Sequence, residues 1–557
     1  MKNNMALIVV RTMIPVLIGG TVLACGNLIG GKNHYITAFL LIILAVALYI
    51  YCVFVLSSKN WMDIRAVFSG AWIGTIGLAA LRLTEYQEPW QNKTWIMMGL
   101  AYGMFLLGAS VGTYCGKGFL LKVQQKINRI SVGRFRFQFH ENRLFWICVI
   151  TTFVGFACFV INVAIKGYIP CFVANGSNEY VDFYTKFYLF AVASTGISGL
   201  CYFCLKSQSS TLIKKIVLLL CIFYSTFVFP ILIVSRGTFV TSALSLATVI
   251  FYLHRKKLVV LVFSIALILG VYYVASQLRG YTDDQLKIFF EPAVITQSTE
   301  EPPVTEPPVT EPPVTEPPST EPPSAEPPST EPPATEPPST EPPSTEPPVT
   351  EPPATESPAT EPPVTEPPAT EPPVTEPLVT EPLVTEPPST FQLSPKLAFL
   401  YSYLTVSHDN FNEAVQNTVG YTYGARQFAP FNVIVRSEKI NQVIADGEYY
   451  LVRDHLNTTN LIGDFYYDFH GVGVVVCMFL WAFVFGVIQS SCDVFKGPFA
   501  LMVLGNSMTP IALCFFATWL SVFSHWMHWG VVLLIAIAAC ITRKPLKAES
   551  ELKAKED

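Results

Sequence analysis

The sequence predicts an all-α polytopic membrane protein with about twelve transmembrane helices. Of the 557 residues, 51% are hydrophobic and only 14% are charged, and the mean hydropathy is +0.42. Soluble domains usually carry about 25% charged residues. Apolar windows of about 20 residues, the length that a helix needs to cross a bilayer, recur along the chain. These observations indicate a protein that is surrounded by membrane lipid and does not bind nucleic acid.

Twelve apolar windows justify the predicted number of helices. Nine of them precede a long polar segment and three follow it, so residues 1–276 and 468–542 are expected to form one bundle in the membrane. The third and the twelfth windows are short. The windows are 12–30, 35–56, 66–81, 95–114, 144–165, 187–205, 216–234, 238–253, 258–276, 468–489, 498–519 and 527–542.

Basic residues between the windows predict the orientation of the bundle. The segment 115–143 carries seven Lys or Arg, and the tail at 543–557 carries five. Cytoplasmic loops of membrane proteins are enriched in these residues. We therefore expect both termini in the cytoplasm and the polar segment 277–467 on the outer side.

The middle of this outer segment is a pentapeptide array of the type EPPVT, with 18 units over residues 301–390. The proline pairs remove backbone donors and fix φ, and the glutamates repel one another, so the array should be disordered or polyproline II-like. Without its 18 glutamates the net charge of the chain would change from −5 to +13. We interpret the array as an expanded repeat that an exposed loop tolerates; a spacer into the cell wall and a glycan acceptor are the alternatives.

The outer segment also has two parts that are not repetitive, 277–300 and 391–467. A Ser-Pro pair at 394–395 precedes a stretch in which apolar residues recur at helical spacing. These apolar residues are Leu397, Leu400, Tyr401 and Leu404. The spacing predicts an amphipathic helix that rests on the outer membrane surface.

One charged residue, Arg236, stands within an apolar stretch. It is the only Lys, Arg, Asp or Glu between Lys215 and Arg255. A charge in such surroundings costs a few kcal/mol unless it reaches water or a partner. About one bilayer crossing separates Arg236 from the basic residues on either side, so we expect it in an outer turn, pointing into whatever the bundle encloses there. The alternative is an arginine that binds lipid headgroups or the carbonyl end of a helix.

A second region, NTTNLIGDFYYDFHGVGVVVCMFLWAFVFG at 457–486, resembles a hallmark of Wzy-type oligosaccharide repeat-unit polymerases, the family that makes O-antigen and capsular polysaccharide. In that family an Asn/Thr-rich turn precedes the pattern G-x-x-Y-x-D-F-G-x-x-G, which enters a membrane helix. The matching residues here are Gly463, Tyr466, Asp468 and Phe469, and an inserted His470 before Gly471 and Gly473 departs from the pattern. The "SRG" at 235–237 resembles a recurrent arginine of the same family. The resemblance covers the chain except for the repeat array.

The resemblance implies a bacterial enzyme of the cytoplasmic membrane with a GT-C-like helical bundle. Such an enzyme moves a growing glycan from its polyprenyl diphosphate carrier onto a fresh lipid-linked repeat unit, at a site that faces outside. Its substrates are polyprenyl-diphosphate-linked oligosaccharides, and a chain-length regulator and a flippase are expected partners. No cofactor and no metal are expected, because the adjacent Asp283 and Asp284 are interpreted as solvated carboxylates.

Outer arginines are the candidates for stabilising the leaving diphosphate, because guanidinium groups hold phosphate oxygens bidentately and stay charged. They are Arg236, Arg279, Arg426, Arg436 and Arg453. The acceptor hydroxyl also needs a general base. The candidates for the base are His408, His455, Asp464 and Asp468, of which His455 and Asp468 are preferred.

Two other functions remain open at this point. A ligase of the O-antigen type has a similar topology and similar Arg and His chemistry, but it hands the glycan to another acceptor. A flippase or transporter of lipid-linked sugars would be expected to show internally repeated halves, and we find no such repeat. The lipid-linked intermediate that accumulates when the protein is absent would separate these functions.

Overall fold

The computed structural model describes residues 2–30, 33–129, 131–132, 135–137, 140–173, 183, 185–206, 211–254, isolated positions between 258 and 270, 393–447, 449–453 and 455–543. The chain divides into two compact units, Met1–Val294 with Ser389–Asp557, and Ile295–Pro388. The repeat array, the segment 277–300, Arg279 and the Asp283–Asp284 pair lie outside the described residues. Most of the window 258–276 and the tail beyond Arg543 lie outside them as well.

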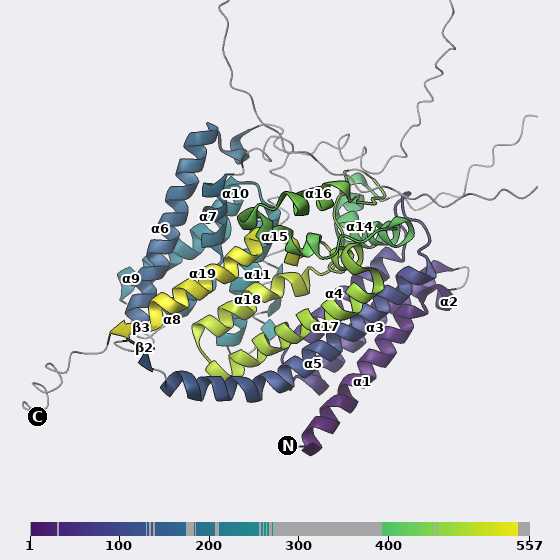
Figure 1. Ribbon diagram of the computed structural model, residues 1–557, viewed down its shortest axis with the longest axis horizontal. Coiled ribbons are helices and arrows are strands. Elements are labelled where there is room, and N and C mark those ends of the chain that lie inside the picture. The colour runs from purple at the N-terminus through teal and green to yellow at the C-terminus, as the bar shows by residue number, and fades with distance from the viewer. Residues whose placement is uncertain are drawn as a thin grey trace, which may run out of the picture. The chain divides into compact units, whose positions relative to one another are not determined.

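The described part of the first unit is almost entirely helical (Figure 1). Its elements are α1 (Lys2–Ala24), α2 (Gly26–Gly30), α3 (His34–Tyr51), η1 (Cys52–Leu56), α4 (Ile64–Ala79), α5 (Asn92–Arg129), β1 (Ser131–Val132), β2 (Phe135–Phe137), α6 (Glu141–Lys166), η2 (Pro170–Phe172), α7 (Lys186–Thr195), α8 (Ser198–Lys206), α9 (Leu212–Phe223), η4 (Tyr224–Val228), α10 (Phe229–Leu232), α11 (Arg236–Leu253), α14 (Pro395–Asn417), α15 (Ala425–Val435), α16 (Glu438–Asp446), α17 (Gly463–Phe495), α18 (Pro498–Ala512), η5 (Trp519–Ser521), α19 (Phe523–Cys540) and β3 (Ile541–Arg543).

Eight helices among the described residues are long and apolar enough to cross a membrane, which confirms a helical membrane protein. Two shorter apolar helices, Val9–Ala24 and Ile64–Ala79, coincide with the first and third predicted windows. The eleventh window corresponds to α18, whose 15 residues are too few for a span by length. The eight are His34–Leu56, Asn92–Lys126, Glu141–Lys166, Lys186–Lys206, Leu212–Leu232, Arg236–Leu253, Gly463–Phe495 and Phe523–Cys540.

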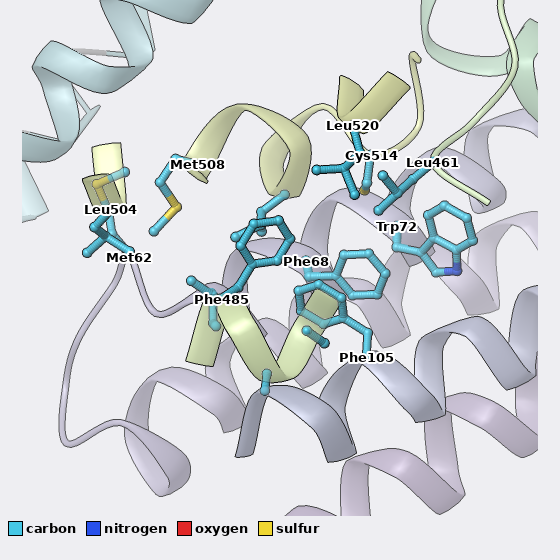
Figure 2. Close-up of a cluster of buried hydrophobic side chains, with 14 of the residues drawn as sticks. Met62, Phe68, Trp72, Phe105, Leu461, Phe485, Leu504, Met508, Cys514 and Leu520 are labelled. Atoms are coloured by element: carbon cyan, nitrogen blue, oxygen red, sulfur yellow. The ribbon is translucent and has the colours of Figure 1, made fainter. Parts of the chain in front are cut away.

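The main core lies where α4, α5, α17 and α18 meet. Figure 2 shows aromatic side chains there, with Phe68 close to Phe105, and their ring centres are 3.7 Å apart. Trp72 continues this stack, because its ring is 5.5 Å from that of Phe68. The core thus joins helices that precede residues 277–467 in the sequence to helices that follow them.

Helices α5 and α17 pack backbone to backbone through small residues. A Cβ at Gly112 would lie only 2.1 Å from the Phe483 carbonyl oxygen, and one at Gly486 would lie 2.3 Å from the Ala109 carbonyl oxygen. Small residues at such spacings allow membrane helices to approach closely. This close pair anchors α17, whose first residues belong to the family-like segment.

Helix α17 is kinked where His470 departs from the family pattern. Phe469 and His470 have non-helical backbone angles, and the φ of His470 is +49°. The His470 ring stacks on Tyr466 with 5.0 Å between ring centres. Beyond the kink the chain passes so near the preceding turn that a Cβ at Gly473 would meet the Phe465 carbonyl oxygen at 2.0 Å. The kink separates residues 463–468 from the remainder of the helix.

The short strands form a three-stranded antiparallel sheet in the order β1-β2-β3. Strand β2 follows α5 and pairs with β3, so that Phe135 lies opposite Arg543. Within this unit, α10, α14, α15 and α16 lie along one end, whereas the start of α1 and the sheet lie toward the other (Figure 1). Two basic segments that are far apart in the sequence therefore come together.

A fully buried ion pair stabilises the start of α4. Asp63 caps this helix, and its carboxylate accepts hydrogen bonds from Arg65 Nε and Nη2, both at 2.9 Å. Gln489 Nε2 donates to the same carboxylate at 2.7 Å, and Arg65 Nη1 donates to Ser110 at 3.3 Å. The pair thus ties α4 to α5 and α17.

Candidate functional site

Helix α14 is present where the sequence predicts a helix, and the structure shows in addition that its polar face is buried. Leu397 and Leu400 are 55% and 48% exposed, whereas the polar residues that follow are buried. The buried polar residues are Ser402, Thr405, Ser407, His408, Asp409, Asn410 and Asn412. The helix packs on α4, α5 and α17, so its polar face is buried against the bundle while Leu397 and Leu400 stay exposed. The physical reason is that apolar side chains are stable against lipid, while polar ones need partners inside the protein.

Arg236 is the first residue of α11, and its side chain is only 6% exposed. Its guanidinium carbon lies 4.6 Å from the ring centre of Tyr403 and 5.5 Å from that of Phe399, both on α14. Nη2 also donates a hydrogen bond to the Tyr403 hydroxyl. The two rings meet edge to face at 4.8 Å. Arg236 therefore joins the start of α11 to α14, which agrees with the expectation that it points into the bundle.

Arg426 has a similar environment. It is 2% exposed, near the start of α15, and its guanidinium carbon lies 3.8 Å and 4.1 Å from the ring centres of Tyr449 and Tyr467. Those rings also meet edge to face, at 5.4 Å. Nη2 donates to the Gly447 carbonyl oxygen at 2.9 Å. Arg426 also lies close enough to Asp464 for electrostatic attraction, so a nearby carboxylate partly balances its charge.

Asp468, a preferred base in the sequence prediction, is buried and accepts four hydrogen bonds. The backbone N–H groups of Arg426 and Gln427 donate to it at 3.2 Å each, the Gln427 side chain at 3.1 Å and the Thr422 hydroxyl at 2.6 Å. Because α15 begins at Ala425, the carboxylate satisfies the free N–H groups of that helix. In this arrangement both carboxylate oxygens of Asp468 have donors, and the carboxylate holds the start of α15 in place.

His408 is also fully buried. Its Nε2 lies 3.0 Å from the Thr75 hydroxyl and its Nδ1 lies 3.1 Å from the Asn460 side-chain nitrogen. Burial lowers its pKa to about 3. The ring joins α14 to α4, and its low pKa makes it a weak base at neutral pH.

His455 and Arg453 line a cavity of about 590 Å³. One wall comes from the segment between α4 and α5, a second from α14 and a third from the segment that precedes α17. The lining residues are Tyr86, Glu88, Trp90, Asp409, Asn412, Glu413, Leu451, Val452, Arg453 and His455. The cavity therefore contains one of the two preferred bases and one of the predicted arginines.

Asp409 is the titratable group of this cavity that the sequence analysis missed. Trp90 Nε1 donates to its carboxylate at 2.8 Å and Gln87 Nε2 donates at 3.0 Å. Burial raises its pKa to about 7, although those hydrogen bonds and Arg82 favour the ionised form. A carboxyl group with a pKa near neutral pH suits general base catalysis. The one hint in the sequence is the run of four polar residues Ser407–Asn410 in the middle of helix α14.

Helix α14 and the segment 449–453 connect the buried arginines to the cavity, and we call these two elements the structural frame of the site. Tyr449 packs on Arg426, and two residues later Leu451 lines the cavity. The backbone at Val452 is fixed to α14, because the Val452 N–H donates to Asn410 Oδ1 at 2.9 Å. Helix α14 carries Tyr403 beside Arg236 and, further along, Asp409 in the cavity wall. Arg436 does not belong to this frame, since it is exposed at the end of α15.

Comparison with protein-family models, with curated proteins and with solved structures found no match to this chain. The site is therefore interpreted from its own geometry. That geometry combines buried arginines on aromatic rings with an acidic, aromatic-walled cavity, at the end of the bundle where α14, α15 and α16 lie (Figure 1).

Proposed function

We propose that this chain is a membrane glycosyltransferase that polymerises polyprenyl-diphosphate-linked oligosaccharide repeat units, as do the Wzy-type enzymes that its sequence resembles. The observation that carries the proposal is the burial of Arg236 at the N-terminus of α11, against Phe399 and Tyr403. A helix N-terminus and a guanidinium both favour a bound anion. Their combination suits a lipid diphosphate.

In the proposed reaction, an acceptor sugar hydroxyl attacks the anomeric carbon of the growing chain. The bond between that carbon and the diphosphate oxygen breaks, and its electron pair leaves with the diphosphate. Arg236 stabilises the charge that develops on this leaving group, with Arg426 as the second guanidinium of the same frame. Removing the interaction should slow the reaction because charge on the leaving oxygen grows toward the transition state.

The hydroxyl proton goes to Asp409, which takes the place of the bases expected from the sequence. Its pKa of about 7 keeps a useful fraction of carboxylate at neutral pH, and it lies in the wall of the cavity. His455, exposed in the same wall, is a candidate to orient the acceptor. No step in this scheme uses a metal or a cofactor.

The proposal includes about twelve membrane crossings, with both termini in the cytoplasm of a bacterium and the site facing outside. The pairing of β2 with β3 supports it, because the basic segment after α5 and the residues after α19 must then lie on the same side. Partners of this enzyme would be a flippase that delivers the repeat units and a chain-length regulator.

Replacement of Arg236 by Ala in cells tests the proposal. We expect long glycan to disappear from gel ladders while single lipid-linked repeat units accumulate, and the amount of protein in the membrane stays within twofold. Arg436→Ala, an exposed arginine at the end of α15, is the matched control and should give normal ladders. Normal ladders from Arg236→Ala would remove this residue from the site, and complete polymer that stays on the carrier lipid would indicate a ligase instead.

A further inference from the structure

The cavity beside α14 has an unbalanced charge. Three acidic side chains, Glu88, Asp409 and Glu413, line it, beside one arginine, Arg453, and one histidine, His455. Asp409 is buried, whereas Glu413 is half-buried and Glu88 is exposed, so the carboxylates extend from the interior to the rim. Like charges that share a site destabilise one another unless a cation lies between them. The lining therefore favours a ligand that carries a positive charge.

The aromatic side chains of the lining favour the same kind of ligand. Tyr86 and Trp90 are buried members of the wall, and the Tyr86 hydroxyl donates to Ser402 at 2.7 Å, which fixes the ring. Aromatic faces attract ammonium groups through their quadrupoles, and they also pack against apolar faces of ring-shaped ligands. The volume of about 590 Å³ falls in the usual range of small-molecule sites, roughly 300–1,000 Å³.

A bare metal ion fits the cavity less well than an organic cation. Among the described residues, no three His, Cys, Asp or Glu side chains converge closely enough to hold a metal ion. Both oxygens of Asp409 already accept hydrogen bonds, from Trp90 and Gln87. A larger ligand can reach Glu88 and Glu413 at the rim while its body fills the space between them.

We infer that this cavity binds a sugar unit bearing a protonated amino group, and that it discriminates against sugars bearing a carboxylate. The inference rests on the proposed function, since it specifies the acceptor repeat unit of that reaction. The amino group would lie near Glu88 and Glu413, and the pyranose ring would lie along Tyr86 and Trp90. Asn412, whose Oδ1 accepts from Thr94 at 2.8 Å, also hydrogen-bonds to Glu413 and so holds that carboxyl group in the wall.

Ligand-observed NMR on the full-length protein in lipid nanodiscs tests this inference. The probes are the methyl glycosides of glucosamine, N-acetylglucosamine and glucuronic acid, slightly below neutral pH, where the amine is protonated. We expect the amino sugar to bind on the order of tenfold more tightly than the uronic acid, with the acetylated sugar between them. Glu88→Gln combined with Glu413→Gln should remove most of this preference, and Glu85→Gln, an exposed neighbour outside the lining, should leave it unchanged.

Equal binding of the uronic acid, absence of binding by the amino sugar, or an unchanged preference in the double variant would overturn the inference. Displacement of the amino sugar by Mg²⁺ at equimolar concentration would overturn it as well, because it would indicate a metal site. These outcomes are independent of the Arg236→Ala ladders. If the amino sugar fails to bind while Arg236→Ala still loses polymer, the inference fails and the proposed function stands. If the amino sugar binds while Arg236→Ala gives normal ladders, the proposed function fails and the binding preference of the cavity stands.

Discussion

Two buried arginines, Arg65 and Arg236, show how differently this bundle treats the same charge. Asp63 holds Arg65 through two hydrogen bonds of 2.9 Å, and Ser110 and a backbone carbonyl complete the arrangement. Arg236 instead packs against the rings of Phe399 and Tyr403, at the first position of a helix. Arg65 belongs to an ion pair that locks α4 to α5 and α17, an arrangement that we call the lock, whereas Arg236 lies at an end of the bundle.

The comparison separates a charge that stabilises the fold from a charge that can take part in a reaction. A buried carboxylate and guanidinium in close contact compensate each other's desolvation, so breaking such a pair mainly destabilises the fold. Aromatic rings attract a guanidinium with less energy, about 0.5–2 kcal/mol. The contacts that Arg236 makes with the Phe399 and Tyr403 rings are therefore weaker than the ion pair that holds Arg65, so the two residues are separable by experiment.

The largest expected effect comes from breaking the lock. Arg65→Ala should lower the free energy of unfolding by roughly 3–5 kcal/mol, because it leaves Asp63 buried without its cation. Thermal unfolding of the purified protein in detergent measures this. Asp63→Leu combined with Arg65→Met removes both charges and should recover much of the loss. Full stability of Arg65→Ala would break the comparison, since Arg65 would then not act as a lock.

Asp409→Asn is expected to reduce polymer formation by about 10²–10⁴-fold, the usual contribution of a general base. In the unaltered protein, activity should fall as the pH drops below about 7, because the reactive form is the carboxylate. Initial rates with purified lipid-linked repeat units, measured across pH, check both points. Asp446→Asn, an exposed aspartate at the end of α16, is the control. Retention of full activity by Asp409→Asn would exclude this carboxylate as the base.

The same residue also predicts a dependence of stability on pH. The pKa of Asp409 is raised from 3.8 to about 7 by burial, so the folded chain holds a proton that the unfolded chain releases within that range. The stabilisation is complete below pH 3.8 and is lost as the pH rises through about 7. Groups facing Asp409 are Gln87, Trp90, Arg82 and Glu413. Between pH 5 and 8, the melting temperature of Asp409→Asn should therefore fall less steeply than that of the parent protein.

A smaller effect should come from the rings beneath Arg236. Tyr403→Leu removes both the ring and the hydroxyl, and a loss of about 1–2 kcal/mol corresponds to roughly tenfold less polymer. Tyr403→Phe keeps the ring and should lose less than half of that energy. Quantified gel ladders at matched protein levels measure both variants. Equal losses in the two variants would show that the hydrogen bond, and not the ring, supports Arg236.

Deletion of residues 301–390 should have the smallest effect. Closure entropy changes only slightly with the length of a long loop, and nearly all of the array lies outside the unit that contains α14 and the cavity. We expect glycan ladders close to normal at equal protein levels. Loss of the ladders would instead favour the interpretation of the array as a spacer that function requires.

Local patterns predicted the helices well, because hydropathy and periodicity depend on neighbours in the chain. The windows around α5, α6 and α11 match helices of the structure, and Ser235 caps α11 directly before Arg236. For α14 the pattern predicted the helix but not the burial of its polar face. Asp409 on that face is hydrogen-bonded to Gln87 and Trp90, which are more than 300 positions away in the sequence.

The roles of single polar residues depended on such distant contacts. Asp468 was predicted as a base, and in the structure its carboxylate accepts hydrogen bonds from the first N–H groups of α15; Asp409 was not predicted and lies in the cavity wall. By itself the sequence determined a helical chain embedded in lipid, with an arginine where an apolar stretch turns, since composition and spacing are properties of the chain alone. Only the tertiary structure decided which carboxylate is buried, which one binds the start of a helix and which one lines a cavity. The reason is that desolvation and hydrogen bonding depend on the residues that folding places next to each carboxylate.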